Sequence, residues 1–166
     1  MSAPLIYRDA EILYILKRVQ TIAMVGASPK WVRPSNFAMK YLQNKGFRVF
    51  PVNPGQAGKE ILGEPCYGRL AEIPGNIDMV DIFRSSKAAG PITDEAIGLA
   101  ADKQIKVIWM QLGVRNDLAA ALAEAAGLTV IMERCPKIEY GRLFGELGWS
   151  GVNSRIISSK RRKLTG

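Results

Sequence analysis

Hydrophobic residues follow two alternating patterns along the chain. Short, nearly uninterrupted apolar runs are typical of strands buried on both faces. They occupy residues 21–25, 47–52, 78–83, 106–110 and 128–132. Stretches with apolar residues three and four positions apart are typical of amphipathic helices, and they occupy residues 5–20, 34–45, 87–102, 116–126 and 136–147. Strands that alternate with helices in this way predict an α/β fold with a doubly wound parallel sheet.

Turn-forming residues separate these segments. Gly26 ends the first apolar run, Pro34 offers a helix start, and Gly46 ends the helix that follows. The run at 21–25 is apolar throughout, so we expect it to be a central strand of a Rossmann-like, three-layer α/β/α domain. The glycine- and proline-rich stretch 55–75 is expected to cover one end of the sheet.

Length and charge indicate one domain with a basic end. A chain of 166 residues can bury about two-thirds of its unfolded surface. We assign residues 1–150 to a single domain with a leading helix over 1–20, and residues 151–166 to a basic tail. The formal net charge is +8, but five of the cations lie between positions 155 and 163. Without them, 18 basic residues face 15 acidic ones, a modest excess that suits an anionic small ligand.

Several classes of protein are disfavoured. A nucleic-acid-binding role would rest on the tail alone, which we interpret as a solvated end. No apolar run approaches the roughly 18 residues that span a membrane. The first residues lack a signal-peptide pattern, so a cytoplasmic protein is predicted. Cys66 and Cys135 have no C-x-x-C spacing, and we interpret them as two reduced thiols.

The residues after the predicted strands are candidate ligand contacts, because doubly wound sheets bind ligands outside the carboxyl ends of their strands. They comprise Gly26-Ala27-Ser28, Asn53-Pro54, Arg84-Ser85-Ser86, Gln111-Leu112-Gly113 and Arg134-Cys135. The first of these loops favours a phosphate, since its glycine allows close backbone approach and a helix N-terminus follows. Lys30 and Arg33 add positive charge there. Glycine and serine after a strand also fit an ordinary turn, so this signal alone is weak.

A conventional dinucleotide site is disfavoured. NAD-binding sheets usually carry G-x-G-x-x-G after the first strand and an acidic residue at the end of the second. Here Gly26 is followed by Ala27-Ser28-Pro29, and the second strand ends in Val52-Asn53-Pro54. An NADP-linked reductase with an atypical loop stays open because of the nearby cations.

A set of short motifs spans about residues 20–145. It consists of Val25-Gly26-Ala27-Ser28, Phe50-Pro51-Val52-Asn53-Pro54, Ile61-Leu62-Gly63, Val80-Asp81-Ile82-Phe83-Arg84, Val107-Ile108-Trp109-Met110-Gln111-Leu112-Gly113 and Glu133-Arg134-Cys135-Pro136. In this combination and order, the motifs resemble the CoA-binding domain of the succinyl-CoA synthetase alpha subunit. They resemble its free-standing, single-domain bacterial relatives more closely.

The resemblance implies a site for coenzyme A (CoA) or an acyl-CoA. By this resemblance, the pyrophosphate would lie at Gly26, Ala27 and Ser28, the adenosine end at Val52, Asn53 and Pro54, the opposite wall at Phe83, Arg84 and Ser85, and the pantetheine arm at Gln111 and Gly113. The synthetase has a lysine two residues after the proline of the second loop, where this chain has Gln56. We expect Lys59, Lys30 or Arg33 to substitute for it.

No catalytic residue set is predicted. The chain contains no histidine, so the phosphohistidine chemistry of the synthetase cannot occur on it, nor can Ser-His or Cys-His nucleophilic catalysis. A CoA-binding module is therefore favoured. The alternative is a subunit or remnant of an acyl-CoA ligase or transferase, and a homodimer or a partner subunit stays open.

Four further residues, two aspartates, a cysteine and a tryptophan, are interpreted as structural. Cys135 is interpreted as a packed, inert thiol in preference to a reactive one facing the CoA thiol. Asp78 and Asp81 are interpreted as solvent-edge or capping residues, and no metal site is predicted. Trp109 is expected in the core.

Trp31, in the loop after the first strand, is equally compatible with shielding a bound adenine and with packing on the protein surface.

Overall fold

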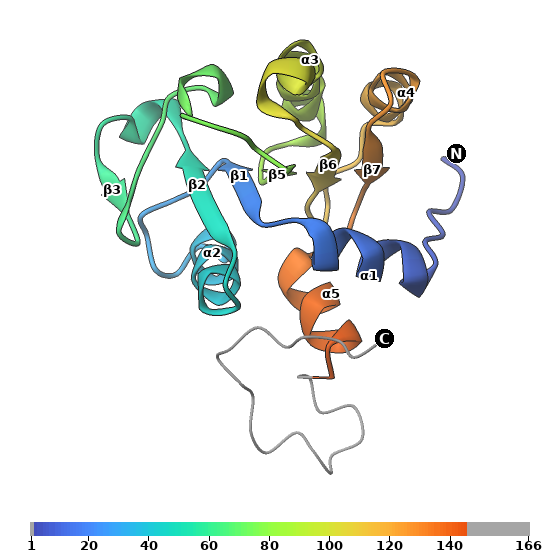
Figure 1. Cartoon of the computed structure of the whole chain (residues 1–166), viewed down its shortest axis with the longest axis horizontal. Coiled ribbons are helices and arrows are strands. Elements are labelled where there is room, and N and C mark those ends of the chain that lie inside the picture. The colour runs from blue at the N-terminus through green and yellow to red at the C-terminus, as the bar shows by residue number, and fades with distance from the viewer. Residues whose placement is uncertain (1, 146–166) are drawn as a thin grey trace.

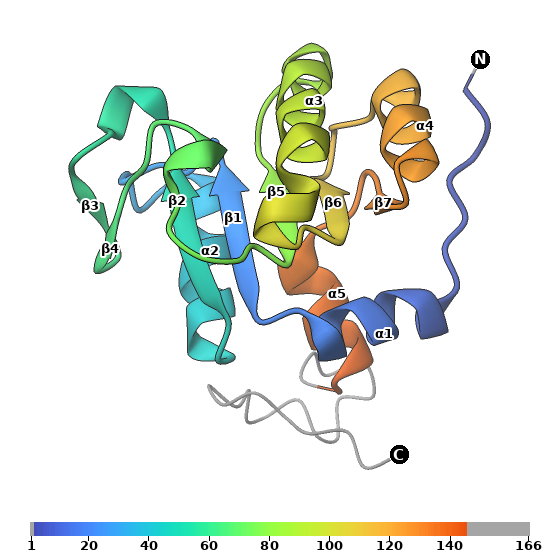
Figure 2. The same cartoon turned by 45° about the horizontal axis from the view of Figure 1, so that its top comes forward.

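Five parallel strands form the centre of the molecule in the computed structural model, which describes residues 2–145. They are β1 (Thr21–Val25), β2 (Arg48–Val52), β5 (Met79–Ile82), β6 (Val107–Met110) and β7 (Thr129–Ile131). Their order in the sheet is β2-β1-β5-β6-β7 (Figure 1). The strands run in one direction, so their carboxyl ends share one edge of the sheet (Figure 2).

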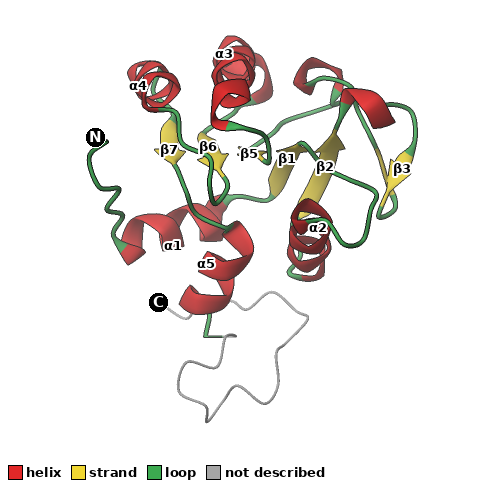
Figure 3. Cartoon of the chain, turned by 180° about the vertical axis from the view of Figure 1, so that it is seen from behind, coloured by secondary structure: helices red, strands yellow, loops and turns green. Residues whose placement is uncertain are grey.

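Helices cover both faces of this sheet. They are α1 (Asp9–Arg18), α2 (Pro34–Asn44), α3 (Ser86–Lys103), α4 (Asp117–Ala125) and α5 (Pro136–Leu143). Helices α3 and α4 lie on one face, and α1, α2 and α5 lie on the other (Figures 1 and 3). The predicted doubly wound, three-layer α/β/α architecture is confirmed.

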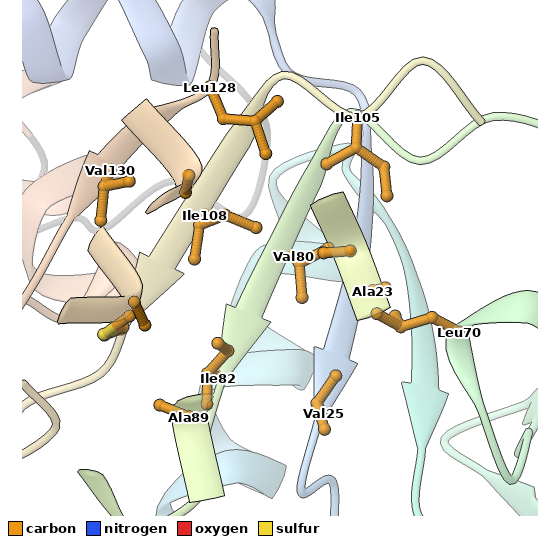
Figure 4. Close-up of a cluster of buried hydrophobic side chains, with 14 of the residues drawn as sticks. Ala23, Val25, Leu70, Val80, Ile82, Ala89, Ile105, Ile108, Leu128 and Val130 are labelled. Atoms are coloured by element: carbon orange, nitrogen blue, oxygen red, sulfur yellow. The ribbon is translucent and has the colours of Figure 1, made fainter. Parts of the chain in front are cut away.

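Alternation along the strands divides the core into two halves. Ala23 and Val25 of β1 point toward α3 and α4, together with residues of the neighbouring strands (Figure 4). Ile22 and Met24 point to the opposite face. Strands buried on both faces explain why the sequence shows continuous apolar runs there. Trp109 is fully buried, as expected, and its indole Nε1 donates to the carbonyl oxygen of Arg134 at 2.8 Å.

The first helix is shorter than the sequence predicts. It begins at Asp9, whereas the apolar spacing predicts a start near residue 5. The preceding residues lie against the end of β7, because the Tyr7 hydroxyl accepts from the backbone N–H of Met132 at 2.9 Å and the Arg134 guanidinium donates to the carbonyl oxygen of Leu5 at 3.1 Å. These long-range contacts outweigh local helical propensity.

The last predicted helix ends at Leu143. Its predicted continuation to residue 147 extends beyond the described residues, and the basic tail 151–166 lies outside them.

The stretch after β2 packs beside β2, which is an edge strand of the sheet. It contains the short strands β3 (Glu60–Ile61) and β4 (Glu64–Pro65), which pair antiparallel. Tyr67 then pairs with the end of β2: its backbone N–H donates to Pro51 at 3.0 Å and its carbonyl accepts from Asn53 at 2.9 Å. The edge of β2 is thereby partly paired.

The structure also bears on the two cysteines and on membrane-spanning segments. Cys66 and Cys135 are both free and buried. Within residues 2–145, no helix is long and apolar enough to cross a lipid bilayer.

Candidate functional site

The strand order contains one point where the direction of winding reverses. From β1 the chain moves outward to β2, whereas β5, β6 and β7 follow one another in the other direction. Strands β1 and β5 are neighbours, so the reversal falls between their carboxyl ends. Ligands of doubly wound sheets bind in the crevice at such a point.

Two helices begin beside this reversal, one on each face. Helix α2 follows β1, and helix α3 follows β5 with Ser85 as its N-cap, whose hydroxyl accepts from Ala88 N–H at 3.1 Å. Neither helix has an acidic residue in its first turn, whereas α4 has Asp117 and α5 has Glu139. The positive ends of α2 and α3 are therefore not neutralised by their own sequence, and they favour an anion between them.

Gly26 brings the loops after β1 and β5 together. Its φ is +93°, and a Cβ here would lie 2.2 Å from the carbonyl oxygen of Phe83 and 2.9 Å from Cδ of Arg84. Its N–H also donates to Val52 at 2.9 Å. The sequence pattern predicts that a phosphate approaches this glycine closely, but in the structure the backbone that approaches it is the protein's own. Glycine is required here by the fold itself.

Asn53 fastens the loop after β2 to the loop after β1. Its Nδ2 donates to the carbonyl oxygen of Ala27 at 2.9 Å, and its Oδ1 accepts from Gly55 N–H at 2.9 Å. Both ends of the amide therefore have protein partners, and the side chain acts as a brace.

The loop after β1 is also held against α2. Asn36 is buried, and its Nδ2 donates to the carbonyl oxygen of Ser28 at 2.9 Å. The Ser28 hydroxyl accepts from Lys30 N–H at 3.1 Å. The sequence offers Asn36 only as a capping candidate at the start of this helix, whereas the structure gives the N-cap position to Arg33. Its bond to Ser28 could not be predicted, because the partner is eight residues away.

Ser86 joins the loops after β5 and β6. Its hydroxyl accepts from Arg115 N–H at 3.0 Å, and its carbonyl oxygen accepts from Asn116 Nδ2 at 3.0 Å. Gly113 lies beside this junction with φ +81°, and a Cβ there would meet no heavy atom within 4 Å. Side-chain hydrogen bonds thus join the loop after β2 to the loop after β1, and the loop after β5 to the loop after β6.

Four exposed cations lie on these loops or just beyond them: Lys30, Arg33, Lys59 and Arg84. Within residues 2–145, none of the four makes an ion pair. Their surroundings are depleted of acids, since the chain has no aspartate or glutamate from Ile12 to Lys59. This acid-free stretch is a sequence signal that motif analysis missed. Cations that make no ion pair in this part of the chain, beside two helix N-termini, give a field that attracts a polyanion.

Two buried polar side chains lie next to the cationic loops. Gln111 is 9% exposed, and its Oε1 has no hydrogen-bond partner among the described residues. Asp81 is fully buried in β5, with neither carboxylate oxygen partnered in the described part of the chain. Burial raises the pKa of the Asp81 carboxyl well above its ordinary value. The expectation that Asp81 is a solvent-edge or capping residue is therefore wrong, because its side chain alternates into the core with Met79.

Asp78 does behave as a capping residue. Its carboxylate accepts from the N–H groups of Gln20 and Thr21 at 2.8 and 3.1 Å.

The predicted contact residues follow four adjacent strands, but they do not all present side chains to one surface. Ala27 and Val52 are buried in the core, so only their backbone faces the edge. Ser28, Pro54, Phe83, Ser85 and Gly113 are at least partly exposed there. Lys59 lies beyond the turn after β2, next to β3.

No metal centre is assembled in the described residues. Cys135 is 8% exposed and precedes α5. Residues 2–145 contain no group of three histidine, cysteine, aspartate or glutamate side chains that could hold a metal ion.

The fold and this edge define the class of doubly wound α/β domains that bind ligands where the winding reverses. Residues 20–141 match the CoA binding domain family, and the chain belongs to this family.

Similar proteins are found in bacteria and archaea. The chain is 36% identical over 131 residues to the uncharacterized protein YneT of Bacillus subtilis, covering 79% of this chain and 93% of that protein. It is 37% identical over 149 residues to acetate–CoA ligase (ADP-forming) I of Archaeoglobus fulgidus, covering 86% of this chain but 21% of the ligase. A hypothetical protein from Pyrococcus horikoshii has a solved structure that superposes with a TM-score of 0.77 at 40% identity, covering 84% of this chain and 94% of that one.

Proposed function

We propose that this chain binds CoA or an acyl-CoA at the carboxyl edge of its sheet. The observation that carries the proposal is the reversal between β1 and β5, where two helix N-termini without acidic residues meet cations that have no ion-pair partner among the described residues. The CoA phosphates carry several negative charges, and such a site favours them without a Walker-type loop.

Individual residues take different parts in this proposal. Lys30, Arg33 and Arg84 attract the phosphates, and the Arg84 side chain passes directly over Gly26. The loop at Asn53 and Pro54 borders the adenosine end. Gln111 borders the pantetheine arm on the β6 side, and its amide oxygen is buried without a hydrogen-bond partner among the described residues.

We further propose that the chain holds its ligand without activating it. The 166 residues include no histidine, and the described residues near the edge offer no nucleophile paired with a base. The match to a fifth of a larger ligase supports a role as the CoA-binding part of an activity whose catalytic groups come from another polypeptide.

Thermal unfolding with a panel of nucleotides tests the site and its ligand. CoA and acetyl-CoA should raise the unfolding midpoint, because a ligand that binds only the native state stabilises it by mass action. NAD, NADP and ATP should raise it less. A shift with NADP and none with CoA would overturn the proposal.

Calorimetric titration of Arg84→Ala locates the site. Loss of one charge-assisted contact should weaken CoA binding about tenfold or more. Lys106→Ala is the matched control, since it removes the same charge at the start of β6, on the opposite edge. Equal losses in the two variants would place the ligand elsewhere.

A further inference from the structure

Helix α4 is apolar on almost every side. Asp117 and Glu124 are the only polar residues among its nine. Ala119, Ala120 and Ala123 are buried in the core between α4, α3 and the sheet. A surface helix normally has a polar outer face, whereas a helix that is apolar all round is normally buried. The outer face of α4 is therefore suited to contact with another protein surface.

Four residues form an exposed apolar stripe along this outer face. Leu118 and Leu122 have exposed fractions of 73 and 49%, and Ala121 and Ala125 are exposed as well. These residues lie three, four and seven positions after Leu118, which places all four on one side of the helix. The same spacing forms the seam between packed helices. We call Leu118, Ala121, Leu122 and Ala125 the α4 stripe.

The α4 stripe lies at the β7 end of the molecule. Helix α4 is the outermost helix on its face of the sheet, beside the edge strand β7 (Figure 1). The N-terminal arm, residues 2–8, runs past the same end (Figure 2). Burial is the main cause that raises the pKa of Tyr7 in this arm, and the charge of Glu124 on α4 adds to it, so the arm lies close to α4. A further exposed apolar side chain, that of Ile6 at 83%, therefore belongs to a segment next to α4.

The α4 stripe is complementary to itself when two copies meet with their α4 helices antiparallel. In that arrangement Leu118 faces Ala125 of the second copy, and Leu122 faces Ala121 of the second copy. Each large side chain then meets a small one, which allows close packing. A parallel pair would instead place leucine opposite leucine and alanine opposite alanine, which leaves gaps between the alanines. The antiparallel pair also brings the positive end of each helix to the negative end of the other.

The charged residues beside the stripe fit the same arrangement. Glu124, near the end of α4, makes no ion pair within residues 2–145. Just before the helix begins, the Arg115 guanidinium neutralises Asp117 through two bonds of 2.7 and 3.1 Å, and it has further N–H groups to donate. Asp117 and Glu124 lie two turns apart on the same side of the helix. Antiparallel helices therefore bring Glu124 of each copy toward Arg115 of the other.

We infer that this chain forms a two-fold symmetric homodimer through the α4 stripe, with the two α4 helices antiparallel. A two-fold interface uses the same surface of both copies, as a self-complementary stripe requires, and it is the commonest interface of soluble oligomers. The inference does not depend on the proposed function, because the cations assigned to the CoA phosphates lie after β1 and β5 and α4 follows β6.

Sedimentation velocity over a range of protein concentrations tests the inference. The chain of 18.2 kDa should sediment as a species of twice that mass, which dissociates on dilution. A monomer at every concentration would overturn the inference.

Variants of the stripe identify the surface that the two copies share. Leu118→Ser and Leu122→Ser should each weaken the dimer about tenfold or more, because each removes a buried leucine from both copies. Both side chains are exposed in the single chain, so thermal unfolding should show that the variants still fold. Ile138→Ser is the matched control, since Ile138 is 46% exposed on α5, on the other face of the sheet. Equal weakening in all three variants, or in none, would overturn the inference.

Disulfide trapping tests the direction of the helices. A mixture of Leu118→Cys and Ala125→Cys proteins should form a disulfide-linked dimer under mild oxidation, because these positions face each other in the antiparallel pair. Leu118→Cys alone should not, since its two copies would lie about 10 Å apart along the helices, beyond the reach of a disulfide. The unchanged chain is the control, because Cys66 and Cys135 are buried. Trapping by Leu118→Cys alone would indicate a parallel pair, and no trapping in the mixture would indicate another surface; either result overturns the inference.

Discussion

The two edges of the sheet differ in how their polar groups are satisfied. At the amino edge, a groove of about 900 Å³ runs between α1 and the first residues of β5, β6 and β7. Its charged groups largely have partners: Arg8 pairs with Glu11 at 2.9 Å, the Arg18 guanidinium lies 4.8 Å from the Tyr14 ring centre, and Asp78 accepts two backbone N–H groups. This edge therefore has a large groove, but most of the charged groups that line it already have a partner within the protein.

The carboxyl edge shows the opposite. There Lys30, Arg33 and Arg84 have no ion pair within residues 2–145, and Gln111 has an unpartnered oxygen. Two helix N-termini add positive field. A ligand gains most where it supplies partners that the protein lacks, so unsatisfied polarity is a better guide to this site than the size of a hollow.

The largest expected difference concerns two glycines with nearly the same backbone angle at opposite edges. Gly26 has φ +93° and Gly127 has φ +91°, but a Cβ meets the Phe83 carbonyl at 2.2 Å only at Gly26. Gly26→Ala should cost about 4 kcal/mol or more, from positive φ plus the overlap with backbone. Gly127→Ala should cost about 1–2 kcal/mol, from positive φ alone. Denaturant unfolding measures both, and equal losses would show that the contact at Gly26 is unimportant.

Asp78 lies at the amino edge of the sheet and Asp81 lies in its interior, so their variants should differ in stability. The native carboxyl of Asp81 holds its proton to a higher pH than the unfolded chain does, since burial raises its pKa. Its contribution to the free energy of unfolding is therefore complete below about pH 4 and is lost as pH rises toward the native pKa. Asp81→Asn should remove this decline and gain about 1–3 kcal/mol at pH 7.

Asp78→Asn is the control for Asp81→Asn, with the opposite sign expected. Its carboxylate accepts two backbone N–H groups, so the variant should lose about 1–2 kcal/mol at pH 7. Denaturant unfolding between pH 5 and about pH 8 tests both variants. If Asp81→Asn kept the same decline in stability with rising pH as the unchanged protein, the raised pKa of Asp81 would be wrong.

The strands and the loops after them were predictable because they depend on local patterns. Continuous apolar runs mark strands buried on both faces, and parallel strands bring their carboxyl ends to one edge whatever their order. Gly26, Arg84 and Gln111 could therefore be assigned to one edge before their contacts were known.

The remaining features depend on contacts between distant residues. The late start of α1 follows from Tyr7 binding Met132, and the brace role of Asn53 follows from its contact with Ala27. No local pattern gives these pairings. The acid-free stretch from Ile12 to Lys59 was readable from the sequence, and it marks the cationic edge.

The smallest expected effect concerns salt. If exposed cations at the carboxyl edge bind the CoA phosphates, raising the salt concentration from about 0.05 to 0.5 M should weaken CoA binding about threefold to tenfold, because the Debye length shortens to a few ångströms. Arg84→Ala should show a shallower salt dependence, since one of the screened charges is gone. Lys106→Ala should keep the full dependence, because its charge lies at the other edge. Calorimetric titration at several salt concentrations measures all three slopes. Identical slopes for Arg84→Ala and Lys106→Ala would remove the electrostatic distinction between the two edges on which the choice of site rests.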